Sequence, residues 1–247
     1  MLPILHIGPL ALQTPGLILL IGLWLGLTLA EKRAHRHAIH PNQIYAYSFA
    51  VLVAGALTAR LTYAVRFSSV FASDPASLIS LNPDLLDPWG GLIGAALVTL
   101  FYKIRYKLNI WALLDALTPA LAVLAVATNL SNLASGNGYG APSTVPWAIF
   151  LWGEWRHPAQ IYEMIAAAAV LAACWLYKGH AVNQAGVYFL RFLAVTAAAR
   201  LFFEAFRGDS ALITGGLRSA QIIAWTILAI CLGLLGRMRK PINSVEE

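Results

Sequence analysis

Long apolar stretches separated by short polar turns run through the whole chain. No Asp, Glu, Lys or Arg occurs between residues 1 and 30 or between residues 116 and 153. Because a helix crosses the roughly 30 Å hydrocarbon core of a bilayer with about 20 apolar residues, such stretches are long enough to span it. The pattern predicts about seven membrane-spanning helices, at residues 11–30, 45–66, 90–106, 111–129, 158–177, 186–205 and 218–236. We therefore expect an all-α, polytopic membrane bundle that forms a single integral membrane domain over residues 1–247.

Composition agrees with this pattern. Hydrophobic residues make up 59% of the 247 positions and charged residues only 11%, far below the roughly 25% of a soluble domain. The first apolar stretch has no Lys or Arg before it and no clear small-residue cleavage pattern after it, so we expect it to remain as a helix. Cys174 and Cys231 fall inside predicted spans, where a thiol behaves as a small apolar group. We expect no disulfide and no metal site.

The distribution of basic residues predicts the orientation in the membrane. Ten of them fall in loops on one side of the predicted bundle: Lys32, Arg33, Arg36, Lys103, Arg105, Lys107, Lys178, Arg237, Arg239 and Lys240. The positive-inside rule makes that side cytoplasmic, with the amino terminus outside and the carboxyl terminus inside. The net charge of +6 is then mainly a topology signal, and its natural partners are anionic membrane lipids rather than nucleic acid.

The remaining basic residues are all arginine: Arg60, Arg66, Arg156, Arg191, Arg200, Arg207 and Arg218. A guanidinium group binds phosphate through a bidentate fork, whereas an ammonium group does not. An outer half that carries only arginine therefore suggests a site for a phosphate-bearing headgroup. The alternative is that these side chains reach the outer interface or pair with acidic residues.

The stretch "ARLFFEAFR" places charges at helical spacing. Arg200, Glu204 and Arg207 stand at i, i+4 and i+7, on one helical stripe. A charged stripe facing lipid is costly, so this one should face the bundle interior or a wet cavity. An ion pair between Arg200 and Glu204 would be a purely structural explanation for two of the three, and it would leave Arg207 to meet an anion.

The stretch "RHPAQIYE" opens the fifth predicted span. Pro158 suits the first position of a helix, and Gln160 stands at the third position, as in a capping box. Glu163 lies roughly 7.5 Å farther along the axis, where a carboxylate needs a partner such as an arginine. An ordinary interfacial helix start anchored by Tyr162 explains the same residues.

The preceding segment, "TNLSNLASGNGYGAPSTVPWAIF", is uncharged but polar, and it follows the fourth predicted span without a clear break. Non-helical backbone near a membrane is tolerated only where protein or water satisfies its polar groups. Asn129, Asn132 and Asn137 could line a cavity, or they could cap a helix and form turns.

Several of these segments occur in an order that resembles a known family. They are "IGPLAL" and "EKRA" around the first span, "ARLTYAV", "FASDP" and "GGLIG" around the second and third, then "RHPAQIYE", "ARLFFEAFR" and "SAQI". Over nearly its whole length the chain is similar to the prolipoprotein diacylglyceryl transferases of the bacterial inner (cytoplasmic) membrane. The resemblance implies transfer of a diacylglyceryl group from phosphatidylglycerol to the lipobox cysteine thiol of a prolipoprotein signal peptide, with release of glycerol phosphate. It implies no cofactor and no catalytic cysteine of the enzyme.

The resemblance also implies roles for particular residues. Arg200 would be the main contact of the phosphate or transition state, with Glu204 orienting it and Glu163 completing the catalytic set. The substrate-binding set would be Arg60, Asn132, His157, Gln160, Tyr162 and Arg207.

At four positions the chain departs from the family pattern. Trp89 replaces a histidine, Asn129 an arginine, Asn137 an acidic residue and Thr196 a tyrosine. The loss of a cation and of a titratable ring removes electrostatic stabilisation of a transition state. Two other functions therefore stay open: a homologue that binds phospholipid or lipoprotein without catalysis, and a lipid transferase with a different acceptor.

Overall fold

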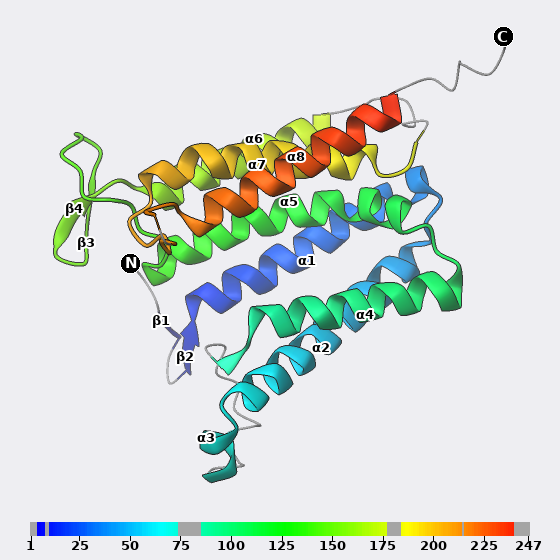
Figure 1. Cartoon of the computed structure of the whole chain (residues 1–247), viewed down its shortest axis with the longest axis horizontal. Coiled ribbons are helices and arrows are strands. Elements are labelled where there is room, and N and C mark those ends of the chain that lie inside the picture. Colours follow the sequence, from blue (N-terminus) through cyan, green and yellow to red (C-terminus); the bar gives the residue numbers. More distant parts are fainter. Residues whose placement is uncertain (1–3, 8–9, 74–84, 177–183, 214, 240–247) are drawn as a thin grey trace. The chain divides into compact units, whose positions relative to one another are not determined.

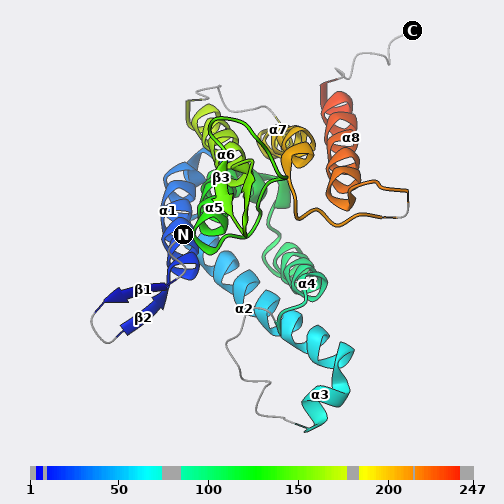
Figure 2. The ribbon, with the colours of Figure 1, turned by 90° about the vertical axis from the view of Figure 1, so that its left-hand side faces the viewer.

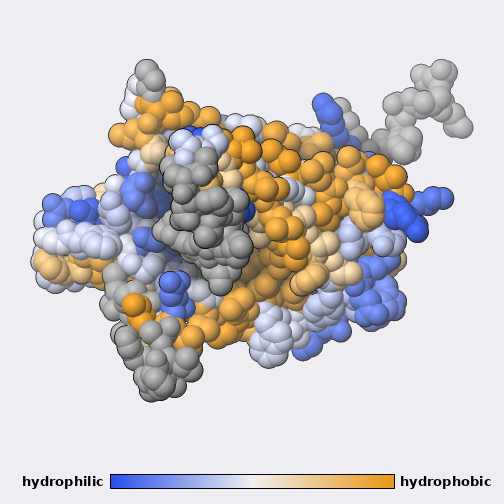
Figure 3. Space-filling view, turned by 90° about the horizontal axis from the view of Figure 1, so that it is seen from below, coloured by the Kyte–Doolittle hydropathy of each residue, from blue (hydrophilic) through white to orange (hydrophobic). Residues whose placement is uncertain are grey.

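The computed structural model describes residues 4–7, 10–73, 85–176, 184–213 and 215–239 (Figure 1). Helices make up most of this part of the chain, as the apolar pattern predicts. Five of them are long and apolar enough to cross a membrane: residues Thr14–His37, Pro41–Arg66, Ile110–Ser135, Ala159–Leu176 and Ser219–Met238. Many of their large apolar side chains are exposed, and Figure 3 shows hydrophobic residues over much of the visible surface. Such a surface suits contact with lipid.

The helices fall into two compact units. The smaller unit, Ala38–Leu113, contains α2 (Pro41–Arg66), α3 (Ser68–Ser73) and α4 (Pro88–Tyr106). The larger unit contains α1 (Thr14–Ala34), η1 (His35–His37), α5 (Ile110–Ser135, from Leu114 on), α6 (Ala159–Leu176), α7 (Val187–Phe203), η4 (Glu204–Phe206) and α8 (Ser219–Arg239). The single domain expected from the sequence stays a prediction.

Two short antiparallel hairpins belong to the larger unit and were not expected from the sequence. They are β1 (Ile4–Ile7) with β2 (Leu10–Gln13), and β3 (Ile149–Leu151) with β4 (Glu154–Arg156). The second hairpin leads directly into α6. It extends beyond the end of that helix (Figure 1).

The smaller unit is held together by close packing of α2 against α4. Gly90 and Gly94 of α4 lie against Thr58 and Thr62 of α2, where the absence of a side chain lets the two backbones approach. Small residues at a helix contact are the usual means of close packing in membranes. The "GGLIG" stretch is therefore explained in part by packing.

This packing predicts a difference between two glycines of α4. In Gly94→Ala the new Cβ would lie 2.7 Å from the carbonyl oxygen of Ala54 and closer still to Thr58, so we expect a loss of stability on the order of 1–3 kcal/mol. Gly91→Ala is the matched control, since its nearest neighbour, the Gly55 carbonyl oxygen, is 3.6 Å away. Thermal unfolding in detergent measures both variants. Equal shifts of Tm would contradict this explanation.

In the larger unit α1 packs closely on α5, and α7 packs on both α6 and α8. Gly22 and Gly26 of α1 leave no room for a Cβ beside Ala127 and Ala120 of α5. Helices α5, α6 and α7 run side by side (Figures 1 and 2). This arrangement places three helices around one cavity.

Both cysteines are free and buried in the apolar core of this unit, as predicted. Cys174 packs with Ala122, Tyr188 and Phe192, and Cys231 packs with Leu190 and Ala194. Each thiol fills apolar space.

Most helix boundaries differ from the expected ones by a few residues, and three of them are informative. The fourth predicted span is too short, because α5 continues through residues 130–135. Polar side chains in this part of the helix have partners on α5 and on α1: the Asn129 amide donates to the Ala125 carbonyl of α5, and the Ser131 hydroxyl donates to the Pro15 carbonyl of α1. The predicted helix start at Pro158 is also off by one, since α6 begins at Ala159. Helix α1 in turn reaches Ala34, beyond the predicted end at residue 30.

Several of the ten basic residues predicted to lie in loops are helical instead, and Arg33 is the buried one among them. It lies in the last turn of α1 and is only 7% exposed. Its guanidinium group donates to the Tyr188 hydroxyl at 2.9 Å and to the Trp175 carbonyl at 2.6 Å. Arg33 therefore ties α1 to α6 and α7. Lys178 and Lys240, in the same predicted group, lie outside the described residues.

Asp115 forms a second link at the same end of α7. It is 1% exposed, and its two carboxylate oxygens accept the backbone N–H groups of Gly186 at 2.6 Å and Phe189 at 2.7 Å. Gly186 is the residue that precedes α7. The carboxylate thus satisfies backbone donors that the start of a helix leaves without partners.

Candidate functional site

A cavity of about 380 Å³ lies between α5, α6 and α7. Most of its wall is apolar or small, which fits a bundle interior. Its polar side chains come from all three helices and from the residue after η4: Thr128, Asn129 and Asn132 from α5, Glu163 from α6, Thr196 and Arg200 from α7, and Arg207. Of the stripe predicted for "ARLFFEAFR", Arg200 and Arg207 line the cavity, whereas Glu204 is buried in the bundle interior.

Glu163 lies between two guanidinium groups. Both of its carboxylate oxygens are 2.9 Å from Nη1 of Arg200, and Oε1 is 3.2 Å from Nη1 of Arg207. The Glu163 side chain is 10% exposed and that of Arg200 is 35% exposed. The predicted arginine partner of Glu163 is thus present, and there are two of them. Charged side chains in a membrane bundle are tolerated where they pair with opposite charges, as the Glu163 carboxylate does with the two guanidinium groups.

Glu204 supports Arg200 from the other side. The helix tightens to a 3₁₀ turn at η4, and the Glu204 carboxylate lies 3.0 Å from Nη2 of Arg200. The side chain is buried and accepts a hydrogen bond from the Ser210 hydroxyl at 2.5 Å. The Arg218 guanidinium donates to the backbone carbonyl of Glu204. This arrangement agrees with the expected pairing of Arg200 with Glu204.

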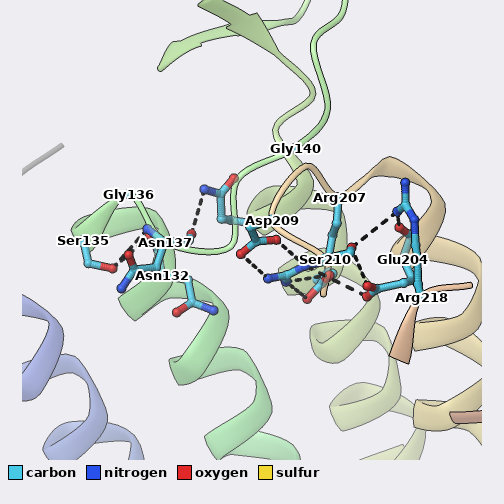
Figure 4. A network of polar contacts seen from close by, with 12 residues as sticks. Asn132, Ser135, Gly136, Asn137, Gly140, Glu204, Arg207, Asp209, Ser210 and Arg218 are labelled. Carbon is cyan, nitrogen blue, oxygen red and sulfur yellow. Dashed lines mark hydrogen bonds and ion pairs between the residues drawn. The ribbon is translucent and has the colours of Figure 1, made fainter. Parts of the chain in front are cut away.

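Arg207 corrects one expectation, because it is not left without a partner when Arg200 pairs with Glu204. Its Nε and Nη2 donate to the two carboxylate oxygens of Asp209 at 2.9 and 2.7 Å (Figure 4). Its Nη1 donates to Glu163. Burial lowers the pKa of Arg207, but Asp209 and Glu163 outweigh this effect and the pKa lies above its ordinary value. Arg207 therefore remains a cation on the cavity wall.

A glycine-rich loop, residues 136–140, closes over Arg207. Gly208 donates its N–H to the Tyr139 carbonyl at 2.9 Å, and Gly140 pairs with Arg207 in an isolated β-bridge. Gly138 has φ +66°, and a Cβ there would lie 3.3 Å from both the Arg207 Nη1 and the Asn132 Nδ2. The left-handed backbone and the close approach together favour glycine at this position.

Three of the predicted substrate-binding residues lie beside the cavity and not among its lining. The Gln160 amide is buried and donates to the Asn137 carbonyl at 3.0 Å. In a capping box the side-chain oxygen of Gln160 would accept a hydrogen bond from the backbone at the start of the helix. This oxygen, Oε1, has no hydrogen-bond partner within the described residues, so the predicted capping box is not formed. His157 and Tyr162 pack with Phe206 in an aromatic cluster.

Arg60 belongs to the smaller unit. Its guanidinium donates to the Leu85 carbonyl at 3.1 Å and lies over the Phe71 ring.

The four residues that depart from the family pattern lie in different places. Asn129 and Thr196 line the cavity, Asn137 is exposed in the loop after α5, and Trp89 is 68% exposed on α4.

Sequence reasoning missed Asp209 and Ser210. Asp209 stands two residues after Arg207, yet the i, i+4 spacing on which the helical stripe was based does not connect them. Their contact depends on the turn that follows η4, where the chain leaves helical geometry at Arg207 (φ −80°, ψ 143°). Only that turn brings the Asp209 carboxylate back onto the guanidinium group.

Chemically, the arrangement is an apolar cavity with two fixed guanidinium groups at one end. Guanidinium groups bind phosphate oxygens in bidentate fashion, and in a site of low polarity they stabilise developing negative charge strongly. Fold and site thus define an α-helical membrane protein with a cavity inside its bundle, on whose wall two arginines pair with carboxylates.

Comparison with known proteins identifies the family within this class. The family model of the prolipoprotein diacylglyceryl transferases matches residues 3–237, and the chain belongs to this family. A phosphatidylglycerol–prolipoprotein diacylglyceryl transferase of Synechococcus elongatus is 30% identical over 94% of this chain and 85% of its own length. An enzyme of the same name from Clostridioides difficile is 24% identical over 94% of this chain and 93% of its own.

Proposed function

We propose that this protein transfers the diacylglyceryl group of phosphatidylglycerol to the lipobox cysteine thiol of prolipoproteins. The observation that carries the proposal is the pair of guanidinium groups, Arg200 and Arg207, on the wall of an apolar cavity in a chain of this family. Such a cavity suits a substrate that is apolar except for one phosphate. The relatives named above act on phosphatidylglycerol and prolipoprotein by their names.

In the proposed reaction the acceptor sulfur forms a bond to the carbon of the diacylglyceryl group that carries the phosphate. The bond between that carbon and the phosphate oxygen breaks, its electron pair leaves with glycerol phosphate, and the thiol gives up its proton. The leaving group gains negative charge in this step. A preorganised cation at the phosphate lowers the barrier because it already points at the place where the charge develops.

The residues take distinct roles in this scheme. Arg200 contacts the phosphate, and Glu204 orients its guanidinium from behind. Glu163, on the cavity wall between the two arginines, holds both groups in place and is a carboxylate that can accept the thiol proton. Arg207 and Asn132 bind the headgroup at the same end of the cavity. For Arg60, His157, Gln160 and Tyr162 we propose substrate binding at the edge of the site.

We also propose that the chain crosses the bacterial inner membrane seven times as one domain. Helices α4 and α7 would supply the two spans beyond the five that are long and apolar enough. The amino terminus would face outward and the carboxyl terminus the cytoplasm, in accordance with the inner basic residues. The cavity end with Arg200 and Glu163 would then open toward the outer leaflet. Both substrates could reach it from the membrane.

Mass spectrometry of a lipobox peptide tests the proposed function. Purified protein in detergent with phosphatidylglycerol should add one diacylglyceryl mass to a peptide that carries the lipobox cysteine. The same peptide with serine in place of cysteine is the control and should stay unmodified. A folded protein that leaves the cysteine peptide unmodified would refute the proposal. Retained phosphatidylglycerol binding in that case would point to a lipid-binding homologue without catalysis.

A further inference from the structure

The Glu163 carboxylate occupies a position in the cavity that suits a phosphate. Both of its oxygens lie 2.9 Å from Nη1 of Arg200, and they lie 3.2 and 3.4 Å from Nη1 of Arg207. One carboxylate thus bridges two guanidinium groups. A phosphodiester, like a carboxylate, shares its negative charge between oxygens, and arginine binds both kinds of anion through the same N–H groups. A phosphate in the cavity would therefore form the same bridge.

The other nitrogen atoms of these two arginines are held by carboxylates outside the cavity lining. Nη2 of Arg200 lies 3.0 Å from Glu204. Nε and Nη2 of Arg207 donate to Asp209 (Figure 4). Neither Glu204 nor Asp209 lines the cavity, whereas Glu163 does. Both guanidinium groups thus stay anchored when Glu163 moves away, and their Nη1 atoms are the ones that a molecule in the cavity can reach.

The charges around the cavity leave no place for a further anion beside Glu163. Three carboxylates contact the two cavity arginines, those of Glu163, Glu204 and Asp209. The Arg218 guanidinium, which donates to the Glu204 backbone carbonyl, adds a third positive charge and makes the cluster neutral. A phosphate would bring an unbalanced negative charge next to the Glu163 carboxylate, where partial burial strengthens the repulsion. Binding of a phosphate therefore favours the departure of Glu163.

The cavity has room for the displaced carboxylate. Its volume is about 380 Å³, and Ala166 and Ala167, one turn beyond Glu163 on α6, line it with small side chains. Asn132 of α5 lines the same cavity and carries an amide that can donate a hydrogen bond to a carboxylate. Rotation of the Glu163 side chain therefore needs no movement of the helices.

We propose that Glu163 is an exchangeable internal anion: in the free protein it takes the place of the donor phosphate, and the phosphate of the lipid displaces it on binding. The inference rests on the proposed function, since it describes how that site takes up its donor. It also describes product release, because Glu163 returns to the two arginines as glycerol phosphate leaves. Without this carboxylate the arginine pair would hold either phosphate more tightly.

Binding of phosphate-bearing ligands to a Glu163→Gln protein tests the proposal. Glutamine has nearly the same shape but no charge, so a phosphate no longer competes with a carboxylate. We expect the affinities for short-chain phosphatidylglycerol and for glycerol phosphate to rise at least about tenfold, the factor that a hydrogen bond to a charged group is worth. Diacylglycerol with the same acyl chains lacks the phosphate, and its affinity should not change. Calorimetric titration of the purified protein in an uncharged detergent measures all three.

Asp209→Asn is the matched control, because it removes one carboxylate from the same arginine pair without opening the cavity side. It should raise the two affinities much less than Glu163→Gln. Equal gains in both variants would show that only net charge matters and would overturn the proposal. An unchanged or weaker affinity for phosphatidylglycerol in folded Glu163→Gln would overturn it too. A gain for glycerol phosphate alone would also contradict it, since Glu163 would then compete with free phosphate and not with the donor.

A second variant keeps the test decisive if Glu163→Gln does not fold. The shorter side chain of Glu163→Asp reaches the two arginines less well, so the affinity for phosphatidylglycerol should again rise, and an unchanged affinity would overturn the proposal. In the transfer assay Glu163→Gln should lower both KM for phosphatidylglycerol and kcat, whereas loss of a residue that merely positions the arginines would raise KM. A wild type that forms no adduct would refute the transferase function and leave the binding test in force.

Discussion

Replacement of Arg200 by alanine is expected to reduce diacylglyceryl transfer by at least about 10²- to 10³-fold. The Arg200 guanidinium contacts two carboxylates, with Nη1 on Glu163 and Nη2 on Glu204, and it is the more exposed of the two cavity arginines. The variant loses the cation that would meet the phosphate. It also leaves Glu204 with one fewer partner in a buried position. Rates of adduct formation on a lipobox peptide measure the effect.

A second variant separates charge from geometry at this position, and a third, at Arg66, is the control. Arg200→Lys keeps the positive charge but cannot contact both carboxylates as a planar fork, so we expect an activity between wild type and Arg200→Ala. Arg66→Ala is the control, because Arg66 is 68% exposed, belongs to the smaller unit and pairs with Asp87. Its transfer rate should equal that of wild type. Unchanged turnover in a folded Arg200→Ala protein would remove Arg200 from the catalytic set.

Replacement of Asp115 by alanine is expected to lower stability by on the order of 3 kcal/mol, with no direct effect on the cavity. Hydrogen bonds to an ionised group contribute roughly 1.5–3 kcal/mol each, and the Asp115 carboxylate accepts two, from Gly186 and Phe189. Their loss leaves the start of α7 without its cap in a buried setting. For a chain of this size the change in Tm is roughly 6–12 °C.

Asp115→Asn is the matched variant for this prediction. The amide retains the shape and one acceptor oxygen, so it should lose roughly half as much stability as Asp115→Ala. Thermal unfolding in one detergent at fixed lipid content compares the three proteins. Transfer activity below the transition should change little, since Asp115 does not line the cavity. A wild-type Tm in Asp115→Ala would show that the carboxylate does not hold α7.

The transfer assay also bears on the residues that differ from the family pattern. Asn129 and Thr196 line the cavity, so the structure brings two of the four departures to the site where the chemistry would take place. Trp89, by contrast, is exposed on α4 of the smaller unit. Inside the larger unit, Arg207 and Asp209 provide a fixed cation beside Arg200. Cations therefore line the same cavity as Asn129.

Several features of this protein follow from the amino-acid sequence by itself. Apolar runs predict helices near the observed positions, because the length needed to cross a bilayer leaves few other structures. The spacing of Arg200 and Glu204 predicts their ion pair, because residues four apart are neighbours on any helix. The order of short motifs indicates the family. All of these depend on neighbours along the chain or on the lipid environment.

Other features were decided only by the tertiary structure. Glu163 meets both arginines because α6 and α7 pack as antiparallel neighbours, and Asp209 reaches Arg207 because the chain turns after η4. The start of the polar segment, residues 130–135, is helical because side chains there and at Asn129 find partners along α5 and on α1, although its composition resembles a loop. Arg33 is buried because α6 and α7 offer it oxygen acceptors. Spacing along one helix cannot determine such contacts, since they depend on how each helix is rotated and shifted against the next, which side-chain packing between helices sets.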